Sequence, residues 1–244
     1  MRPRIVIPMG DAAGIGPEII LKALADPETA ASARCLVIGS GQVLERAMGY
    51  PGMPRLRLNR VPSPERGLYT SGVLDLMDLD NISMDSYEVG RVSAMCGRAA
   101  YDCIAKAIEL AMEGRTDAVV TPPINKESLK AAGVPYIGHT EIFGALTGTA
   151  DPLTLFEVRS LRIFFLTRHV SLRQACGLVT KDRIVSYAIR CTEALRKLGI
   201  REGTMAVAGL NPHSGEHGLF GDEEVREVAP AVEALQEMGY AVAG

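Results

Sequence analysis

Short runs rich in β-branched residues alternate along this chain with longer segments of helical period. The expected strands are residues 4–8, 34–38, 55–61, 117–121, 153–158, 161–166 and 205–208. The expected helices are residues 16–25, 43–48, 92–113, 141–146, 181–198 and 223–238. Strands that alternate with helices are typical of an α/β protein, so the pattern predicts an α/β fold with a largely parallel sheet.

The helix expected over residues 92–113 has the clearest pattern. Apolar and small side chains recur on one face at spacings of three and four, and the pattern stops at Gly114: Cys96, Ala99, Ala100, Cys103, Ile104, Ala107, Ile108 and Ala111. The strand over residues 117–121 follows at once. These two segments therefore predict one helix–strand unit of the sheet.

Two regions fit the pattern poorly. Residues 49–90 are richer in Pro, Gly and Ser, and we interpret them as one strand with long irregular connections, including the acidic-hydrophobic run 74–80. After the last helix, residues 240–244 resemble the start of another strand. We therefore expect a truncated chain, 1–244, built of two closely packed α/β subdomains.

The composition limits the function. With 47% hydrophobic residues among 244, the chain can bury a large core, and one or two domains are both allowed. The net charge of −3, with acids and bases interspersed, does not favour nucleic acid or an anionic membrane as partner. No apolar stretch approaches the roughly 20 residues that cross a bilayer, and the N-terminal apolar run is too short for a signal peptide. We therefore expect a cytoplasmic protein with a small-molecule ligand.

The five cysteines lack a Cys-x-x-Cys pair and lie mostly in apolar segments. Such cysteines are typical of small buried thiols, so we assign them no function.

The first segment that could take part in binding or catalysis is Met9-Gly-Asp-Ala-Ala-Gly-Ile-Gly-Pro-Glu18, between a strand and a helix. Glycines at the start of a helix can cradle a phosphate, and Pro17 suits the first helical turn. The spacing matches neither G-x-G-x-x-G nor the Walker A motif. A purely structural turn explains the segment equally well.

The second segment, Thr121-Pro-Pro-Ile-Asn125-Lys126, directly follows a strand, where open α/β sheets place their binding loops. Asn125 and Lys126 can offer a donor and a cation to an anionic substrate. The simpler interpretation, which we favour on these residues alone, is a helix cap by Asn125 beside a solvated lysine.

The third segment is Gly138-His139-Thr140-Glu141, at the start of a helix. A histidine and a hydroxyl beside free backbone N–H groups can bind an anion. An N-cap threonine next to a surface histidine explains the same residues.

Two further histidines follow expected strands. His169 comes after residues 161–166 and His213 after residues 205–208, and we expect both at the carboxyl ends of parallel-type strands, where α/β folds concentrate their sites. Neutral imidazole is a common ligand of catalytic divalent metals. His217 lies in a glycine-flanked loop and is the weakest candidate. A lone histidine after a strand is usually structural or merely exposed, but two in equivalent positions indicate His169 and His213 as candidate site residues.

Together, residues 9–18, 138–141, 167–169 and 209–216 with Leu219-Phe-Gly221 resemble the PdxA family of 4-hydroxythreonine-4-phosphate dehydrogenases, in order over essentially the whole chain. The resemblance implies an isocitrate/isopropylmalate-dehydrogenase-like α/β/α architecture and a homodimer with a shared active site. It also implies NAD as oxidant, a divalent metal such as zinc, magnesium or cobalt, and a link to pyridoxine biosynthesis. By this resemblance His139 and Thr140 contact the phosphorylated substrate, while His169 and His213 bind the metal.

The family's third metal histidine has no counterpart in this sequence, so we expect weak metal binding and uncertain activity of this chain. The loop 123–127 and the acidic pattern 78–82 are more similar to the branch that acts on 4-phosphothreonate or 4-phosphoerythronate. The implied reaction oxidises a secondary alcohol β to a carboxylate, passes hydride to NAD and releases carbon dioxide. The catalytic base and the nucleotide contacts are not visible in the sequence, and Lys126 is one candidate base.

Two other functions remain open. In the first, the same histidines bind a metal for phosphoester hydrolysis, with Glu216 activating water. In the second, the chain is an inactive phosphate-binding subunit.

Overall fold

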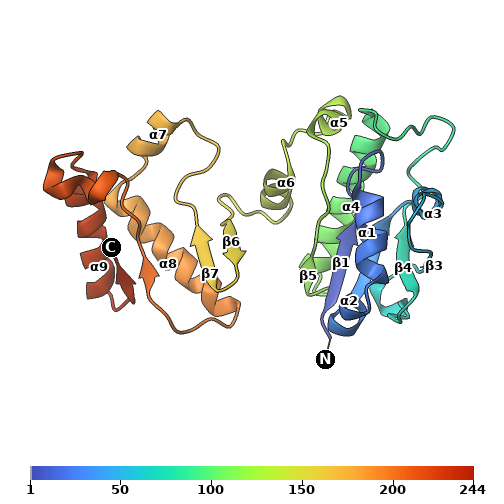
Figure 1. The fold of residues 1–244 in the computed structure, drawn as a ribbon, viewed down its shortest axis with the longest axis horizontal. Coiled ribbons are helices and arrows are strands. Elements are labelled where there is room, and N and C mark those ends of the chain that lie inside the picture. The colour runs from blue at the N-terminus through green and yellow to red at the C-terminus, as the bar shows by residue number, and fades with distance from the viewer. Residues whose placement is uncertain (1) are drawn as a thin grey trace. The chain divides into compact units, whose positions relative to one another are not determined.

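The computed structural model describes residues 2–244. The chain divides into two compact units, Met1–Pro152 and Leu153–Gly244 (Figure 1). Each unit has its own hydrophobic clusters.

The first unit contains a five-stranded sheet. Its strands are β1 (Arg4–Pro8), β2 (Arg34–Gly39), β3 (Arg57–Arg60), β4 (Val73–Asp78) and β5 (Ala118–Val119), in the order β3-β4-β2-β1-β5. All four neighbouring pairs are parallel, with Val6 of β1 opposite Leu36 of β2 and Val119 of β5. The prediction of an α/β fold with a parallel sheet is confirmed.

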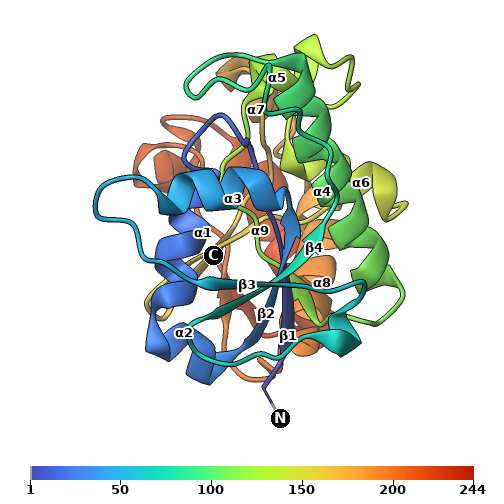
Figure 2. The same cartoon turned by 90° about the vertical axis from the view of Figure 1, so that its right-hand side faces the viewer.

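Alternating side chains of the central strands bury opposite faces of this sheet. Ile7 and Val37 pack in a cluster with side chains of α1 (Gly16–Ala25) and α3 (Gly41–Met48). Val6 and Leu36 pack in another cluster with Cys103 of α4 (Ala94–Met112) and its neighbours. This period of two is what a strand buried on both faces requires. The result is an α/β/α layer arrangement, with α1 and α4 on opposite sides of the strands (Figure 2).

Strand β4 corrects the interpretation of residues 74–80 as irregular chain. It lies between β2 and β3, and its Asp75 is only 1% exposed. The Asp75 carboxylate accepts hydrogen bonds from Leu68 N–H (3.0 Å), Tyr69 N–H (2.7 Å) and Asn59 Nδ2 (2.6 Å). A buried carboxylate is tolerated when donors satisfy it, so an acidic residue can occupy an interior strand here.

Short helices complete the first unit. The sequence did not predict α2 (Pro27–Ser32) or the 3-10 turn η1 (Pro64–Arg66). Helix α5 (Lys126–Ala131) was anticipated only through the interpretation of Asn125 as a helix cap, and α6 (His139–Leu146) begins two residues before the expected start. Helix α2 has the cap that its start requires, because the Asp26 carboxylate accepts Glu28 N–H at 2.9 Å. On the side of α4 away from the sheet, Ile104 and Ile108 pack with Leu129 of α5 and Ile142 of α6.

The second unit contains two small sheets and two longer helices. Strands β6 (Leu155–Val158) and β7 (Leu161–Phe164) form an antiparallel pair, while β8 (Met205–Ala206) and β9 (Val242–Ala243) are parallel. The remaining elements are α7 (Leu172–Gly177), α8 (Lys181–Lys197), η2 (Pro212–Gly218), the π-helical turn η3 (Glu224–Val228) and α9 (Ala229–Glu237). Side chains of α8, α9 and β9 form one cluster of its core, which includes Ala188, Val232, Leu235 and Val242.

Three sequence predictions for this unit have different outcomes. A final strand is confirmed as β9, and the strand before His213 is parallel as expected. The prediction of a parallel strand before His169 is wrong, because β7 pairs antiparallel with β6. In residues 2–244, no helix combines the length and the apolar character that crossing a membrane requires.

Candidate functional site

The loops that follow β1 and β5 meet at the carboxyl edge of the first unit's sheet. The chain runs from β1 to β2 on one side of β1, whereas β5 lies on the other side. The Asp11 N–H donates to the Pro123 carbonyl oxygen at 3.1 Å, which joins the two loops. In open α/β sheets ligands bind where the strand order reverses in this way. The topology therefore predicts a ligand-binding site at this edge of the sheet.

The glycines of residues 9–18 are explained by close backbone packing. Gly10 has a φ of +74°, and a Cβ atom on it would lie 2.6 Å from the Pro123 carbonyl oxygen. A Cβ atom on Gly16 would lie 2.4 Å from the Met9 carbonyl oxygen. Pro17 occupies the first turn of α1, as expected. These contacts favour the structural interpretation of this segment.

Two ionisable side chains of this edge received no role from the sequence. Asp11 is 7% exposed and accepts the Ala13 N–H at 3.1 Å, and burial raises the pKa of its carboxyl group. The Tyr87 hydroxyl donates to the Ala12 carbonyl oxygen at 2.7 Å, and burial raises the pKa of Tyr87 to about 12. Both side chains hold the loop in place, since their hydrogen bonds end on its backbone.

The start of α5 agrees with the simpler interpretation of residues 121–126. The Asn125 side chain caps the helix by accepting Ser128 N–H at 3.0 Å, and Lys126 is exposed. The cap does not involve the Lys126 side chain. A Cβ atom on Gly138 would lie 3.9 Å from Cε of Lys126, so this side chain extends over the start of α6.

His139 is the first residue of α6. Gly138 is the N-cap, so the interpretation of Thr140 as the N-cap is wrong. His139 is half-buried, and its Nε2 atom is buried without a hydrogen-bond partner within residues 2–244. Burial lowers the pKa of His139, because it penalises the charged imidazolium. The structure thus gathers Lys126, His139 and Thr140 around the start of α6.

The two other candidate histidines lie in the second unit. His169 follows β7, is exposed and has a φ of +53°. His213 follows β8 in η2, is exposed, and its ring centroid lies 6.1 Å from that of Phe220. A positive φ is uncommon for residues other than glycine, and held strain of this kind clusters at functional sites.

The backbone around His213 forms a left-handed turn. His213, Ser214, Gly215, Glu216 and His217 all have φ between +45° and +76°. For residues other than glycine this conformation costs roughly 1–2 kcal/mol each. Such a turn needs support, and Glu224 hydrogen-bonds the chain just before it, at Leu210 and Asn211. The sequence did not reveal Glu224, because two of its three partners are backbone N–H groups.

The donors fit a divalent metal in their chemistry. His169 and His213 offer two exposed imidazoles from the same unit, and imidazole suits zinc and cobalt in particular. Within the described chain, residues 2–244, no group of three or more His, Cys, Asp or Glu side chains is placed to hold a metal ion.

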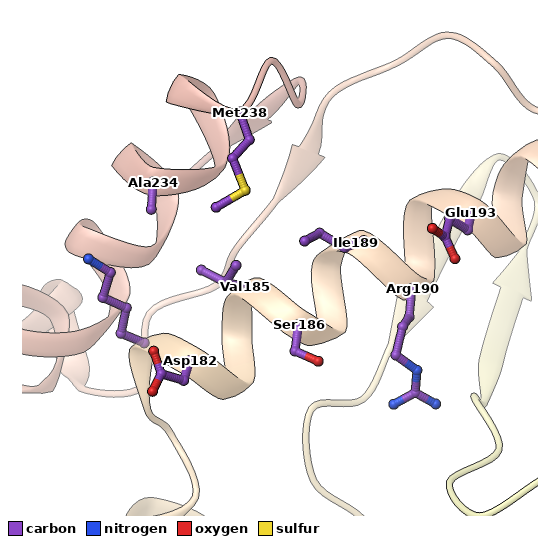
Figure 3. A pocket seen from close by; sticks show the side chains of 9 residues that line it. Asp182, Val185, Ser186, Ile189, Arg190, Glu193, Ala234 and Met238 are labelled. Carbon is purple, nitrogen blue, oxygen red and sulfur yellow. The ribbon is translucent and has the colours of Figure 1, made fainter.

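A groove between α8 and α9 of the second unit contains none of the predicted site residues. Val185 of α8 and Met238, which follows α9, point into the space between these elements (Figure 3). Its remaining lining residues are Lys181, Asp182, Ser186, Ile189, Arg190, Glu193 and Ala234.

Comparison with known proteins gives the family. The model of the family described as "Pyridoxal phosphate biosynthetic protein PdxA" matches residues 31–244. The chain belongs to the PdxA family. It is therefore an oxidoreductase, and the isocitrate-dehydrogenase-like α/β/α fold that the resemblance implied is confirmed.

Curated relatives match the chain over its whole length. Proteins from Clostridium botulinum and Symbiobacterium thermophilum, each named "Putative D-threonate 4-phosphate dehydrogenase", are 54% and 57% identical over 243 residues. These alignments cover 100% of this chain and 72% of each relative.

Solved structures of PdxA dehydrogenases are also similar. The 4-hydroxythreonine-4-phosphate dehydrogenase from Klebsiella pneumoniae is 39% identical, with a TM-score of 0.92 over 100% of this chain and 73% of that one. The enzyme of that name from Burkholderia phymatum is 39% identical, with a TM-score of 0.88 over 100% of this chain and 74% of that one.

Proposed function

We propose that this protein oxidises D-threonate 4-phosphate with NAD as oxidant and a divalent metal as cofactor. The observation that carries the proposal is the identity of 54% and 57%, over the whole chain, to proteins named for that substrate. Three solved relatives named for 4-hydroxythreonine 4-phosphate are 34–39% identical. The sequence pattern of residues 78–82 and 123–127 favours the same branch of the family.

The reaction removes hydride from the carbon that bears the hydroxyl group β to the carboxylate. The hydride passes to NAD, and the hydroxyl proton leaves to a base. The β-keto acid then loses its carboxyl group as carbon dioxide, and the electron pair of the broken bond forms an enolate that is protonated. The product is a three-carbon keto phosphate.

The residues at the start of α6 suit the anionic substrate. Since its pKa is lowered, His139 is neutral at pH 7 and offers a hydrogen bond from a buried nitrogen that has no partner in the described chain. The positive charge comes from Lys126, which extends over Gly138. Backbone N–H groups in the first turn of α6 add further donors beside Thr140. Together these groups would hold one anionic end of the substrate and orient the reacting carbon.

His169 and His213 are the proposed metal ligands. When bound, the metal lowers the pKa of the substrate hydroxyl and stabilises negative charge on that oxygen. His169 and His213 would hold the ion, and its remaining ligands would be groups other than these two histidines. The proposal includes a homodimer, which light scattering would test through the molar mass in solution.

The decisive experiment follows NADH formation by the full-length protein. We expect kcat/KM for D-threonate 4-phosphate to exceed that for 4-hydroxythreonine 4-phosphate by about tenfold or more, and a chelator to abolish turnover until Zn²⁺, Mg²⁺ or Co²⁺ is restored. The His169→Ala variant should lose activity as well. Phosphate release without NAD would favour the hydrolase instead, and turnover that resists the chelator would exclude the metal.

A further inference from the structure

Glu224 places a carboxylate under the segment that leads to His213. It is 8% exposed and lies at the start of η3. Its Oε1 atom accepts the backbone N–H groups of Leu210 and Asn211, each at 2.7 Å, and its Oε2 atom accepts the Asn211 side-chain amide at 2.9 Å. These hydrogen bonds lower the pKa of Glu224 to about 2, so the group is ionised at neutral pH.

The left-handed turn packs directly on this carboxylate. A Cβ atom on Gly215 would lie 2.8 Å from the Glu224 Oε2 atom and 2.7 Å from the Gly221 carbonyl oxygen. The Asn211 carbonyl oxygen accepts Ser214 N–H at 3.1 Å. Glu224 therefore contacts the turn where the chain enters it, through Asn211, and again at its middle, through Gly215.

His213 is the first of the five left-handed residues and lies two positions after Asn211, with Pro212 between them. A strained conformation persists only where its surroundings determine it. The three hydrogen bonds to one charged group supply that constraint, since bonds to an ionised acceptor are stronger than neutral ones.

We propose that Glu224 is a positioning residue, which fixes the left-handed turn and thereby orients His213 toward a bound divalent metal. The inference rests on the proposed function, in which His213 is a metal ligand. Groups that orient metal ligands without touching the metal contribute strongly to affinity, so loss of Glu224 should weaken metal binding.

The test measures Co²⁺ binding to the full-length protein by its visible absorption, without substrate or NAD. In the Glu224→Gln variant one oxygen acceptor becomes an amide donor, so residue 224 can no longer accept all three hydrogen bonds, although the Asn211 side-chain amide keeps its bond to Glu223 Oε2 at 2.7 Å. We expect Co²⁺ affinity to fall roughly 10- to 100-fold and hydrogen exchange over residues 209–221 to accelerate. The Glu224→Asp variant, which keeps the charge on a shorter arm, should recover part of the affinity and also serves if Glu224→Gln does not fold.

Two controls separate positioning from general stability. Glu233→Gln makes the same substitution at an exposed position of α9 and should change neither measurement. Val232→Ala removes two methyl groups from the core of the same unit and should lower Tm while leaving Co²⁺ affinity unchanged.

The outcomes distinguish the positioning role of Glu224 from the proposed metal site itself. If the unsubstituted protein binds Co²⁺ and Glu224→Gln binds it equally well, Glu224 does not position His213 and the proposed function stands. The same conclusion holds if Val232→Ala weakens binding as much as Glu224→Gln. If the unsubstituted protein binds no Co²⁺, the metal assignment itself is wrong and this inference falls with it.

Discussion

The Pro123 carbonyl oxygen accepts the N–H of Asp11 at 3.1 Å, which ties the loop after β1 to the loop after β5. The contact depends on Gly10, because any side chain there would strike the same carbonyl oxygen. The two loops, from strands distant in sequence, are thus joined by a backbone–backbone hydrogen bond, while the side chains of Asp11 and Tyr87 hold the first loop itself.

The first prediction concerns Gly10 and uses Gly52 as its control. Both have φ near +75°, but nothing lies within 4 Å of a Cβ atom on Gly52. Each alanine variant should lose about 1–3 kcal/mol from left-handed strain. Gly10→Ala should lose a further ~1–3 kcal/mol from overpacking against Pro123. Urea unfolding followed by circular dichroism measures the difference, and equal losses in the two variants would show that the close contact carries no energetic weight.

Asp75 shows why part of the fold escaped prediction. The run 74–80 contains three acidic residues, and the surrounding segment 49–90 is rich in Pro, Gly and Ser and lacks a sustained period, so the sequence favours irregular chain there. The carboxylate of Asp75 accepts hydrogen bonds from the backbone N–H groups of Leu68 and Tyr69. The loop between β3 and β4 brings these two groups to it. Sequence periodicity detects burial on a face, whereas it does not detect donors delivered from elsewhere in the chain.

The second prediction therefore concerns Asp75→Asn. The substitution replaces one acceptor oxygen by a donor, so at least one of the N–H groups facing it is left buried and unpaired. We expect a loss of about 1–3 kcal/mol in unfolding free energy. Asp85→Asn, at an exposed position of the same unit, should remain within about 0.5 kcal/mol of the original protein. A similar loss in both variants would contradict the role of Asp75.

Some residues of the candidate site could likewise be predicted from the sequence, and others could not. Motif residues such as His139 and His213 could be selected from the sequence, because their chemistry and their position after strands are local features. Glu224 could not, since its role depends on backbone N–H groups of Leu210 and Asn211 that the fold brings to it. The antiparallel pairing of β7 could not be predicted either, because a strand's period of two is identical in parallel and antiparallel sheets.

The third prediction is a pH dependence from His139. Burial lowers its folded-state pKa below the ordinary value of 6.5, so the unfolded chain binds a proton more readily than the folded one. The neutral histidine's contribution to stability is present above about pH 6.5 and decreases as pH falls below it. His139→Asn removes this term, so the stability advantage of the original protein over the variant should shrink from pH 8 to pH 5.5. Urea unfolding at both pH values tests this, with His217→Asn as an exposed control. A difference that stays constant or grows on acidification would contradict a buried neutral His139.

The last prediction concerns Lys126, which extends over Gly138 at the start of α6. If its ammonium group binds the anionic substrate, Lys126→Ala should raise KM for D-threonate 4-phosphate roughly 10- to 100-fold, the value of one hydrogen bond to a charged group. Because Lys126 is exposed and Asn125 supplies the helix cap, the unfolding free energy should change by less than about 0.5 kcal/mol. Lys130→Ala removes the same charge from the last turn of α5 and should leave KM unchanged. A fall in kcat at constant KM would instead assign Lys126 to proton transfer, and unchanged kinetics would remove it from the site.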